Sequence, residues 1–174
     1  MRRLRYSVAA SLDGCIAGPN GEFDWIPMDP DIDFAAMYAE FGAIVMGRAS
    51  YEAAAAVEAG GVSAFSLPVY VYSRSLPEGP RDGVTVVHDG VAHARQLKAQ
   101  PGKDVWLWGG GELYRALAAE GLVDAVTVAI VPILLGGGIP LVPSPGPRSA
   151  LRLRSHRVYP VTGTVMLDYD VERG

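Results

Sequence analysis

Short apolar segments, separated by glycines and prolines, constrain the fold more than any other feature of this chain. The 21 glycines and 13 prolines are spread between these segments and do not pool into a linker. Six segments rich in Val, Ile, Tyr and Trp are predicted to be strands: Leu4–Ala10, Ala43–Met46, Val69–Tyr72, Val84–Val87, Val105–Trp108 and Ala125–Val131. Several are continuous apolar runs, which are typical of strands covered on both faces.

Helical patterns alternate with these strands. The predicted helices are Ile32–Glu40, Ala49–Glu58, Val91–Ala99 and Glu112–Glu120. Gly121 stands where a C-terminal glycine cap belongs. The alternation favours right-handed crossovers between parallel strands. The last stretch, Leu151–Val171, has two extended segments around Pro160–Gly163 and predicts a hairpin. We therefore expect an α/β fold: a three-layer, doubly wound, mainly parallel sheet of about eight strands with an antiparallel C-terminal hairpin.

Length, charge and composition exclude several classes of function. The 174 residues suffice for one substantial core, so we expect a single domain over residues 1–174. A net charge of −4, with both signs interspersed, leaves no basic stripe for nucleic acid. No apolar run approaches the roughly 20 residues of a membrane span. Cys15 is the single cysteine, which excludes an intrachain disulfide and favours a cytoplasmic location.

Metal chemistry is also not expected. The three histidines are scattered, without the i, i+4 spacing of paired metal ligands. One cysteine cannot supply the zinc-binding signature of nucleobase deaminases. We therefore predict no metal site.

The strongest local signal is a strand that runs through three glycines into a helix. In VWLWGGGELYRAL, residues Gly109, Gly110 and Gly111 join the two elements. Glycines let a ligand approach the backbone, and the free N–H groups of a helix start favour a phosphate or pyrophosphate. A tight turn that requires positive φ is the alternative interpretation. The spacing differs from the G-x-G-x-x-G fingerprint of classical dinucleotide-binding domains.

Two further strand ends carry Arg and Ser. IVMGRASYE places Arg48 and Ser50 in the first turn of a helix after Gly47, and VYVYSRS ends in Ser73 and Arg74. A guanidinium fork and nearby hydroxyls suit a phosphate, and ligands of open α/β sheets bind at this edge. The alternative is that Arg48 is a solvated surface residue and Ser50 a helix cap.

These motifs, in order and spacing, resemble the three NADPH-binding segments of the dihydrofolate reductase superfamily. SLDG at 11–14 and VPILLGGGIPLVP at 131–143 are more similar to the reductase domain of the riboflavin-pathway deaminase-reductase, the RibD C-terminal domain, and its stand-alone relatives. The resemblance extends from about residue 4 to 171.

The resemblance implies NADPH as cofactor and a role for each matching residue. Arg48, Ser50, Ser73 and Arg74 would hold the 2′-phosphate and pyrophosphate. Gly47, Gly109, Gly110, Gly111, Glu112 and Leu113 would surround the pyrophosphate with backbone. The backbones of Ala9 and Ile16 would fix the nicotinamide carboxamide. Such a clamp orients the transferable hydride toward the substrate.

On the substrate side, the resemblance directs attention to Trp25, Phe34 and three aspartates, Asp29, Asp31 and Asp33. Counting back from Gly47 selects Asp31 as the catalytic acid, whereas counting forward from Trp25 does not quite agree. Acids at a helix start are also favourable to the helix dipole and need no further role. Asp13 could contact substrate or cofactor, or form an ordinary turn.

The predicted activity is hydride transfer from NADPH to a C=N or C=O carbon of a small heterocyclic or sugar-imine substrate, resembling 5-amino-6-(5-phosphoribosylamino)uracil reductase. Dihydrofolate reduction and non-catalytic NADPH binding are the alternatives. A homodimer, formed through the apolar edge around Val126–Leu135 and the final hairpin, is a further expectation.

Overall fold

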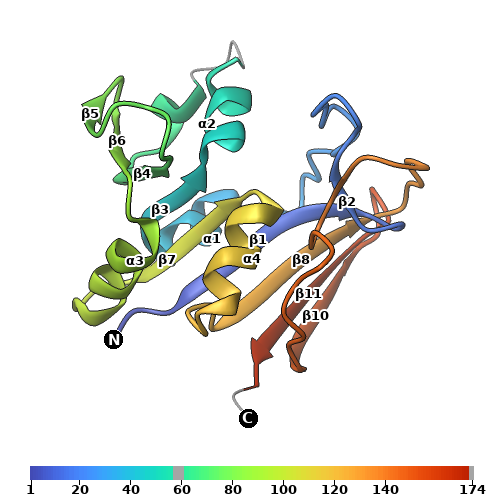
Figure 1. The fold of residues 1–174 in the computed structure, drawn as a ribbon. Helices are drawn as coiled ribbons and strands as arrows, with labels where there is room; N and C mark the ends of the chain where they lie inside the picture. The colour runs from blue at the N-terminus through green and yellow to red at the C-terminus, as the bar shows by residue number, and fades with distance from the viewer. Residues whose placement is uncertain (57–60, 173–174) are drawn as a thin grey trace.

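A computed structural model describes residues 1–56 and 61–172 of the protein. In this part of the chain, nine strands form the main sheet in the order β10-β11-β8-β1-β7-β3-β4-β6-β5 (Figure 1). Their bounds are β1 Leu4–Ser11, β3 Phe41–Gly47, β4 Val69–Tyr72, β5 Gly79–Arg81, β6 Val84–Val87, β7 Asp104–Gly109, β8 Ala125–Val131, β10 Leu151–Tyr159 and β11 Thr164–Val171. A separate antiparallel pair consists of β2 (Cys15–Ala17) and β9 (Ile139–Pro140).

The strand directions confirm the predicted fold class. Strands β1, β3, β4, β6, β7 and β8 are parallel to their neighbours within this group. The C-terminal hairpin is antiparallel: β11 pairs with β8, and β10 pairs with β11. The short strands β2, β5 and β9 were not predicted, because two or three residues show no hydrophobic period.

The helices cover both faces of the sheet, as a doubly wound fold requires. They are α1 (Phe34–Ala39), α2 (Arg48–Ala55), α3 (Gly90–Ala99) and α4 (Gly111–Ala119), with a 3₁₀ turn η1 at Gly61–Ala64. Each α-helix lies within two or three residues of its predicted bounds, except that the expected end of the second helix, Glu58, lies outside the described residues. Gly121 has φ +64° and ends α4 as its position predicted.

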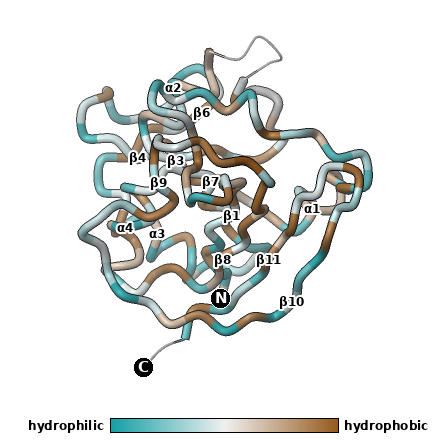
Figure 2. The backbone as a smooth tube through the Cα atoms, turned by 90° about the vertical axis from the view of Figure 1, so that its right-hand side faces the viewer, coloured by the Kyte–Doolittle hydropathy of each residue, from teal (hydrophilic) through white to brown (hydrophobic). Residues whose placement is uncertain are grey.

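Two apolar clusters, one on each face, hold the layers together. On the face of α3 and α4, the buried residues include Tyr6, Leu107 and Leu117. On the face of α1 and α2, they include Phe41, Met46 and Trp106. Alternate residues of β7 therefore serve opposite cores, which explains its continuous apolar sequence. Figure 2 shows these hydrophobic central strands surrounded by a more polar rim.

Strand β1 lies inside the sheet, next to the central strand β7. It pairs with β7, where Leu4 lies opposite Val105, and with β8 from Arg5 to Ser11. At its start, the backbone N–H of Leu4 donates to the Asp124 carboxylate at 2.8 Å, and the same carboxylate forms an ion pair with the buried Lys98. The first strand is thereby fixed to α3 and to the start of β8.

The exposed edge of the sheet differs from the one expected. Strand β8, which begins the predicted edge at Val126, is flanked by β1 and β11 and lies inside the sheet. On this side of the sheet the edge strand is β10, which is exposed along almost its entire length, and β5 forms the opposite edge. The apolar run of β8 reflects burial between neighbouring strands and layers, and not an unpaired edge.

Candidate active site

The three segments predicted to bind a cofactor meet on adjacent strands. The order β7-β3-β4 places Gly109, Gly47 and Ser73 at the carboxyl ends of three neighbouring parallel strands. The register brings Met46 opposite Gly109 and Gly47 opposite Tyr72. The carboxyl edge is where open α/β sheets bind their ligands.

The glycine turn leaves its backbone uncovered by side chains of its own. Gly109 has φ +155°, a conformation that is essentially restricted to glycine, and the Gly109–Gly110 peptide is cis. A Cβ built on Gly109 would lie 3.1 Å from the Ser50 hydroxyl, and one on Gly111 would lie 2.8 Å from Pro143 Cδ. The absence of side chains lets α2, the turn and the segment after β9 pack closely.

The helices that start at this edge lack side-chain caps. α2 begins after Gly47 and α4 after Gly110, and neither N-cap residue supplies a side-chain hydrogen bond. By contrast, Asp33 caps α1 by accepting from the Ala36 N–H, and Asp89 caps α3. Free N–H groups and the positive end of the helix dipole favour an anion at the starts of α2 and α4.

The predicted Arg and Ser residues surround the same edge. Arg48 is half-exposed and donates to Glu52 Oε1 at 2.7 Å and to the Ser75 hydroxyl at 2.8 Å. Ser73 is buried, and its hydroxyl accepts from the backbone N–H groups of Ser75 and Leu76. Ser75 was not predicted as a site residue, although its position two residues after Ser73 could have indicated it.

Arg74 and Ser50 keep their polar groups available. Arg74 is exposed, and its side chain forms no hydrogen bond or ion pair with residues 1–56 or 61–172. The Ser50 hydroxyl likewise has no hydrogen-bond partner in this part of the chain, so it does not cap α2. Glu112 is exposed and pairs with Arg115 at 2.6 Å, while Leu113 is half-buried against the core of α4.

The residues predicted to hold the carboxamide lie on β1, the strand next to β7, and on the separate strand β2. Ala9 is half-buried in β1, opposite Ala129 of β8. Ile16 is half-buried in β2, whose pairing with β9 uses Cys15 and Ala17 and is irregular between them. Because strand β7 lies beside β1, the backbone of Ala9 and the glycine turn share one edge of the sheet.

Asp13 joins two loops above this edge. Its carboxylate accepts from the Ser11 hydroxyl at 2.6 Å, the Gly136 N–H at 2.8 Å and the Leu135 N–H at 3.2 Å. These hydrogen bonds lower the pKa of Asp13, and the bond from the Ser11 hydroxyl is the largest cause. Since three donors of the chain itself occupy the carboxylate, Asp13 connects the β1–β2 turn to the loop before β9.

The three aspartates before α1 have three different environments. Asp29 is buried, and its Oδ2 accepts from the Thr162 hydroxyl at 2.7 Å and from the Thr162 N–H at 3.2 Å. These Thr162 bonds lower the pKa of Asp29. Asp33 caps α1. Asp31 is exposed, and its carboxylate forms no hydrogen bond with the described residues.

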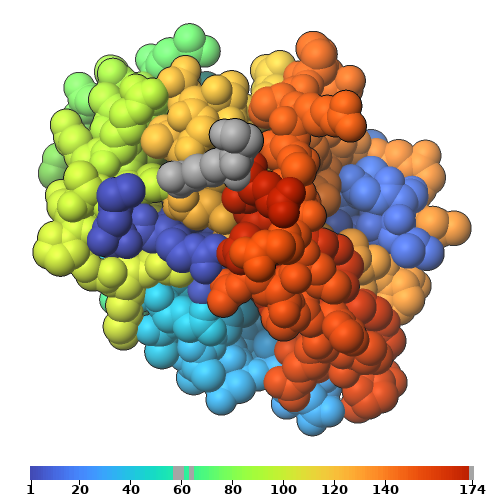
Figure 3. Space-filling model, turned by 90° about the horizontal axis from the view of Figure 1, so that it is seen from below, coloured from blue at the N-terminus to red at the C-terminus, as the bar shows by residue number. Residues whose placement is uncertain are grey.

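The backbone of Asp31 is held on both sides. Its N–H donates to Asp29 Oδ1 at 2.9 Å, and its carbonyl accepts a long hydrogen bond from Arg157 Nη2 at 3.4 Å. Arg157 and Thr162 belong to the C-terminal hairpin, whose tip packs beside the segment before α1 (Figure 3). Sequence reasoning missed this contact because the two segments lie more than 120 residues apart.

Aromatic residues border the segment before and within α1. Trp25 is half-buried and donates from Nε1 to the Glu22 carbonyl at 3.2 Å. Phe34 is half-buried, with its ring centroid 6.3 Å from that of Tyr38. Tyr38 contacts Trp106, whose indole donates to the Ser7 carbonyl at 2.8 Å. Phe34 is thus linked through Tyr38 to the core that includes Trp106 of β7.

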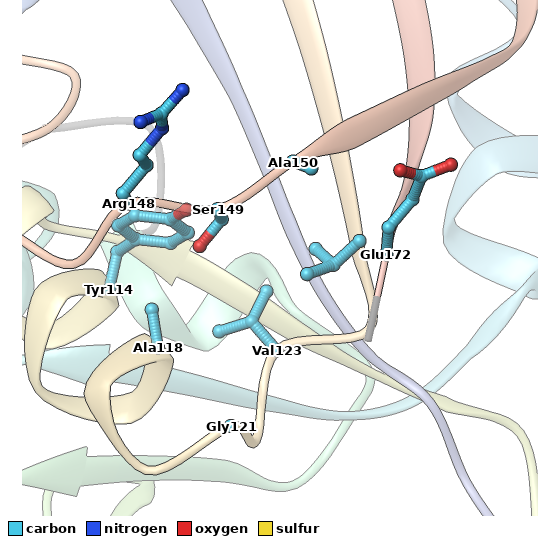
Figure 4. Close-up of a pocket in the computed structure, with 9 residues that line it drawn as sticks. Tyr114, Ala118, Gly121, Val123, Arg148, Ser149, Ala150 and Glu172 are labelled. Carbon is cyan, nitrogen blue, oxygen red and sulfur yellow. The ribbon is translucent and has the colours of Figure 1, made fainter. Parts of the chain in front are cut away.

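A cavity of about 310 Å³ is lined by none of the predicted site residues. It is located between α4 and the start of β10, and Tyr114, Ala118, Val123 and Ser149 line it (Figure 4). Burial raises the pKa of Tyr114. This cavity lies near the C-terminal end of α4, whereas the glycine turn lies at its N-terminal end. We therefore place the candidate active site at the glycine turn.

The fold and this edge define a reductase-like architecture of the dihydrofolate reductase type. The family model of the RibD C-terminal domain matches residues 2–167, and the chain belongs to this family. The Bacillus subtilis protein YyaP, itself uncharacterized, is 32% identical, with 97% of this chain and 94% of YyaP covered. YwjB of the same organism is 28% identical, with 91% of this chain and 92% of YwjB covered.

Solved structures agree with this membership. A Shewanella sp. PV-4 protein named for riboflavin biosynthesis is 27% identical and has a TM-score of 0.83. The match covers 99% of this chain and 100% of that protein. The Thermotoga maritima diaminohydroxyphosphoribosylaminopyrimidine deaminase / 5-amino-6-(5-phosphoribosylamino)uracil reductase is 15% identical, with a TM-score of 0.71. This chain aligns over 98% of its length with 57% of that bifunctional enzyme, which shows the shared fold.

Proposed function

We propose that this protein is an NADPH-dependent reductase that delivers a hydride to a C=N or C=O carbon of a small molecule. Membership in the RibD C-terminal domain family supports an oxidoreductase function. The Thermotoga maritima relative is named as both a deaminase and a reductase, and this chain corresponds to little more than half of it. The proposed reaction resembles the reductase activity in that name.

One observation carries the proposal. Two helices begin at glycines on adjacent strands without side-chain caps, and Arg74 and Ser50 stand beside them without partners among the described residues. Helix starts, a guanidinium and a hydroxyl together fit a pyrophosphate and an additional phosphate. That charge pattern favours NADPH over NADH.

Each residue has a definite task in this proposal. NADPH supplies the hydride when bound. Arg48, Arg74, Ser50 and Ser73 bind its phosphates, and the backbone of Gly109–Gly111 allows the pyrophosphate to approach α4. The backbones of Ala9 and Ile16 orient the carboxamide, so that the reactive carbon faces the substrate.

On the substrate side, Asp31 is the proposed proton donor. Of the three aspartates before α1, it is the one whose carboxylate is not engaged by the described residues, whereas Asp29 and Asp33 hold backbone and side-chain donors. Trp25 and Phe34 would contact the substrate ring. Asp13 would shape the site through its loop contacts, since its own oxygens are occupied.

A cofactor titration tests the proposal directly. NADPH and NADH are titrated against tryptophan fluorescence, because Trp106 is buried and Trp108 immediately precedes the glycine turn. We expect tight NADPH binding, much weaker NADH binding, and loss of this preference in the Arg48→Ala/Arg74→Ala double variant.

The matched control is Arg95→Ala, which removes an exposed arginine of α3 that pairs with Glu120. It should leave both affinities unchanged. If the folded protein binds no NADPH, the proposed function is wrong. If it binds NADPH but oxidises it with no imine, carbonyl or dihydrofolate acceptor, non-catalytic binding is the better description; turnover of dihydrofolate would assign the alternative reductase activity.

We further propose that the chain acts as a single domain in the cytoplasm and associates as a homodimer. Among the described residues, no helix has the length and apolar character of a membrane span.

One face of β10 bears Leu151, Leu153 and Val158, and these three residues are 42–56% exposed. An exposed edge strand with apolar residues is suited to burial against a second copy. Sedimentation equilibrium tests this, with Leu153→Lys expected to produce monomers.

A further inference from the structure

Arg157 differs from the other arginines of the C-terminal hairpin. Arg152 and Arg154 both approach the Asp170 carboxylate, at 3.1 Å and 3.6 Å. Arg157 has no carboxylate within ion-pair distance among residues 1–56 and 61–172. Its guanidinium lies 4.8 Å from the centroid of the Tyr159 ring, and its one hydrogen bond to the described residues goes to the Asp31 carbonyl, at 3.4 Å. The side chain is thus oriented but not neutralised.

The strand register places Arg157 in line with the proposed hydride-transfer position. Arg157 lies opposite Met166, Met166 opposite Ala129, and Ala129 opposite Ala9. Residues paired in this way point to the same face of a sheet. Three strand spacings of about 4.8 Å separate Ala9 from Arg157 by roughly 14 Å. Between them, Ala129 and Met166 present half-buried apolar side chains.

The carboxylate of Asp29 does not neutralise Arg157. The Thr162 hydroxyl is the largest cause of the lowered pKa of Asp29, and the charge of Arg157 is the smallest of the causes that lower it. The Asp29 oxygens, however, already accept from the Thr162 hydroxyl, the Thr162 N–H and the Asp31 N–H. Arg157 has five N–H donors and gives one to the Asp31 carbonyl, so a bidentate pair for an anion remains.

We propose that Arg157 is a specificity residue for an anionic group on the substrate. The proposal rests on the reductase function above. The reducible ring would lie at Ala9, its connecting arm would cross Ala129 and Met166, and a phosphate monoester or carboxylate at the end of the arm would bind Arg157. The planar fork of Arg matches either anion, and the Tyr159 ring fixes its plane.

Site-resolved NMR of arginine side chains provides the test. The full-length protein, saturated with NADP⁺, is titrated with inorganic phosphate and separately with acetate at constant ionic strength, and each Arg Nε–Hε resonance is followed. We expect a saturable shift at Arg157 that is absent at Arg152, and the anion that binds more tightly identifies the class of group. Arg157→Gln should weaken the binding of that anion roughly tenfold. Arg152→Gln, on the same strand and face, should change it less than twofold.

The outcomes separate this proposal from the reductase function. Equal shifts at Arg157 and Arg152, or no shift at Arg157, would overturn the anion site even if NADP⁺ binds. If NADP⁺ does not bind, the cofactor proposal fails, while the Arg157 resonance still reports on the anion. Once an acceptor is known, Arg157→Gln should raise KM for its anionic form with little change in kcat, and leave a neutral analogue unaffected.

Discussion

The candidate site has two halves, a cofactor half over β3, β4 and β7 and a substrate half over β1, β10 and β11, and they differ in which polar groups they leave free. Over β3, β4 and β7, two helix starts are uncapped, and Ser50 and Arg74 have no side-chain partners in the described chain. Over β1, β10 and β11, the carboxylates of Asp13 and Asp29 each accept three hydrogen bonds from the chain itself. Groups left free are available to a ligand, whereas groups satisfied internally hold the loops around it.

The largest effect is expected at the glycine turn. Gly109→Ala introduces a side chain at φ +155° and 3.1 Å from the Ser50 hydroxyl, so we expect a loss of about 1–3 kcal/mol in stability and of NADPH affinity by roughly a hundredfold or more. Urea unfolding and the fluorescence titration measure the two quantities.

Gly121→Ala is the matched control. Gly121 also has positive φ, +64°, but ends α4 with no neighbour within 4 Å of the added Cβ. It should lose about 1 kcal/mol of stability and retain NADPH affinity. Equal losses of affinity in both variants would mean that stability, and not the shape of the turn, determines binding.

An intermediate effect separates free from engaged hydroxyls within the cofactor half. Ser50→Ala should leave stability within about 0.5 kcal/mol, because its hydroxyl has no partner in the described chain, but weaken NADPH roughly tenfold. Ser73→Ala removes the acceptor of two backbone N–H groups and should cost about 1–3 kcal/mol of stability. If Ser50→Ala were instead the more destabilising change, the division into free and engaged groups would not hold.

The smallest effect is a pH dependence on the substrate half. The lowered pKa of Asp29 means that its stabilising contribution is present above the ordinary value of about 3.9 and is lost as pH falls through the lower folded value. Thr162→Val removes the largest cause of that shift. Melting temperatures should therefore differ between variant and native protein at neutral pH and converge in acid.

Thr162→Ser keeps the hydroxyl and serves as the control, with a melting curve close to native at every pH. A gap between Thr162→Val and native protein that stays constant down to the acid limit would show that the Asp29 carboxylate is not the group responsible.

Local patterns and long-range contacts differ in how far they could be predicted from sequence. Strands such as Val105–Trp108 and the helix after Gly111 follow from local apolar patterns and glycines, and the order of elements determines the parallel sheet. The contact of Thr162 with Asp29 joins residues 133 positions apart and has no local signal. For that reason Asp29 could not be distinguished from Asp31 and Asp33, although the cap that Asp33 forms with the Ala36 N–H is local.

The position of β1 inside the sheet has a consequence for how the chain folds during its synthesis. Its neighbours β7 and β8 begin about a hundred residues later, at Asp104 and Ala125. A ribosome that makes the chain in the N- to C-terminal direction releases β1 long before either neighbour exists, and the hairpin of β10 and β11 emerges after both. Such long-range pairing slows folding, and the nascent chain must keep an apolar strand from aggregating until β7 and β8 have been made.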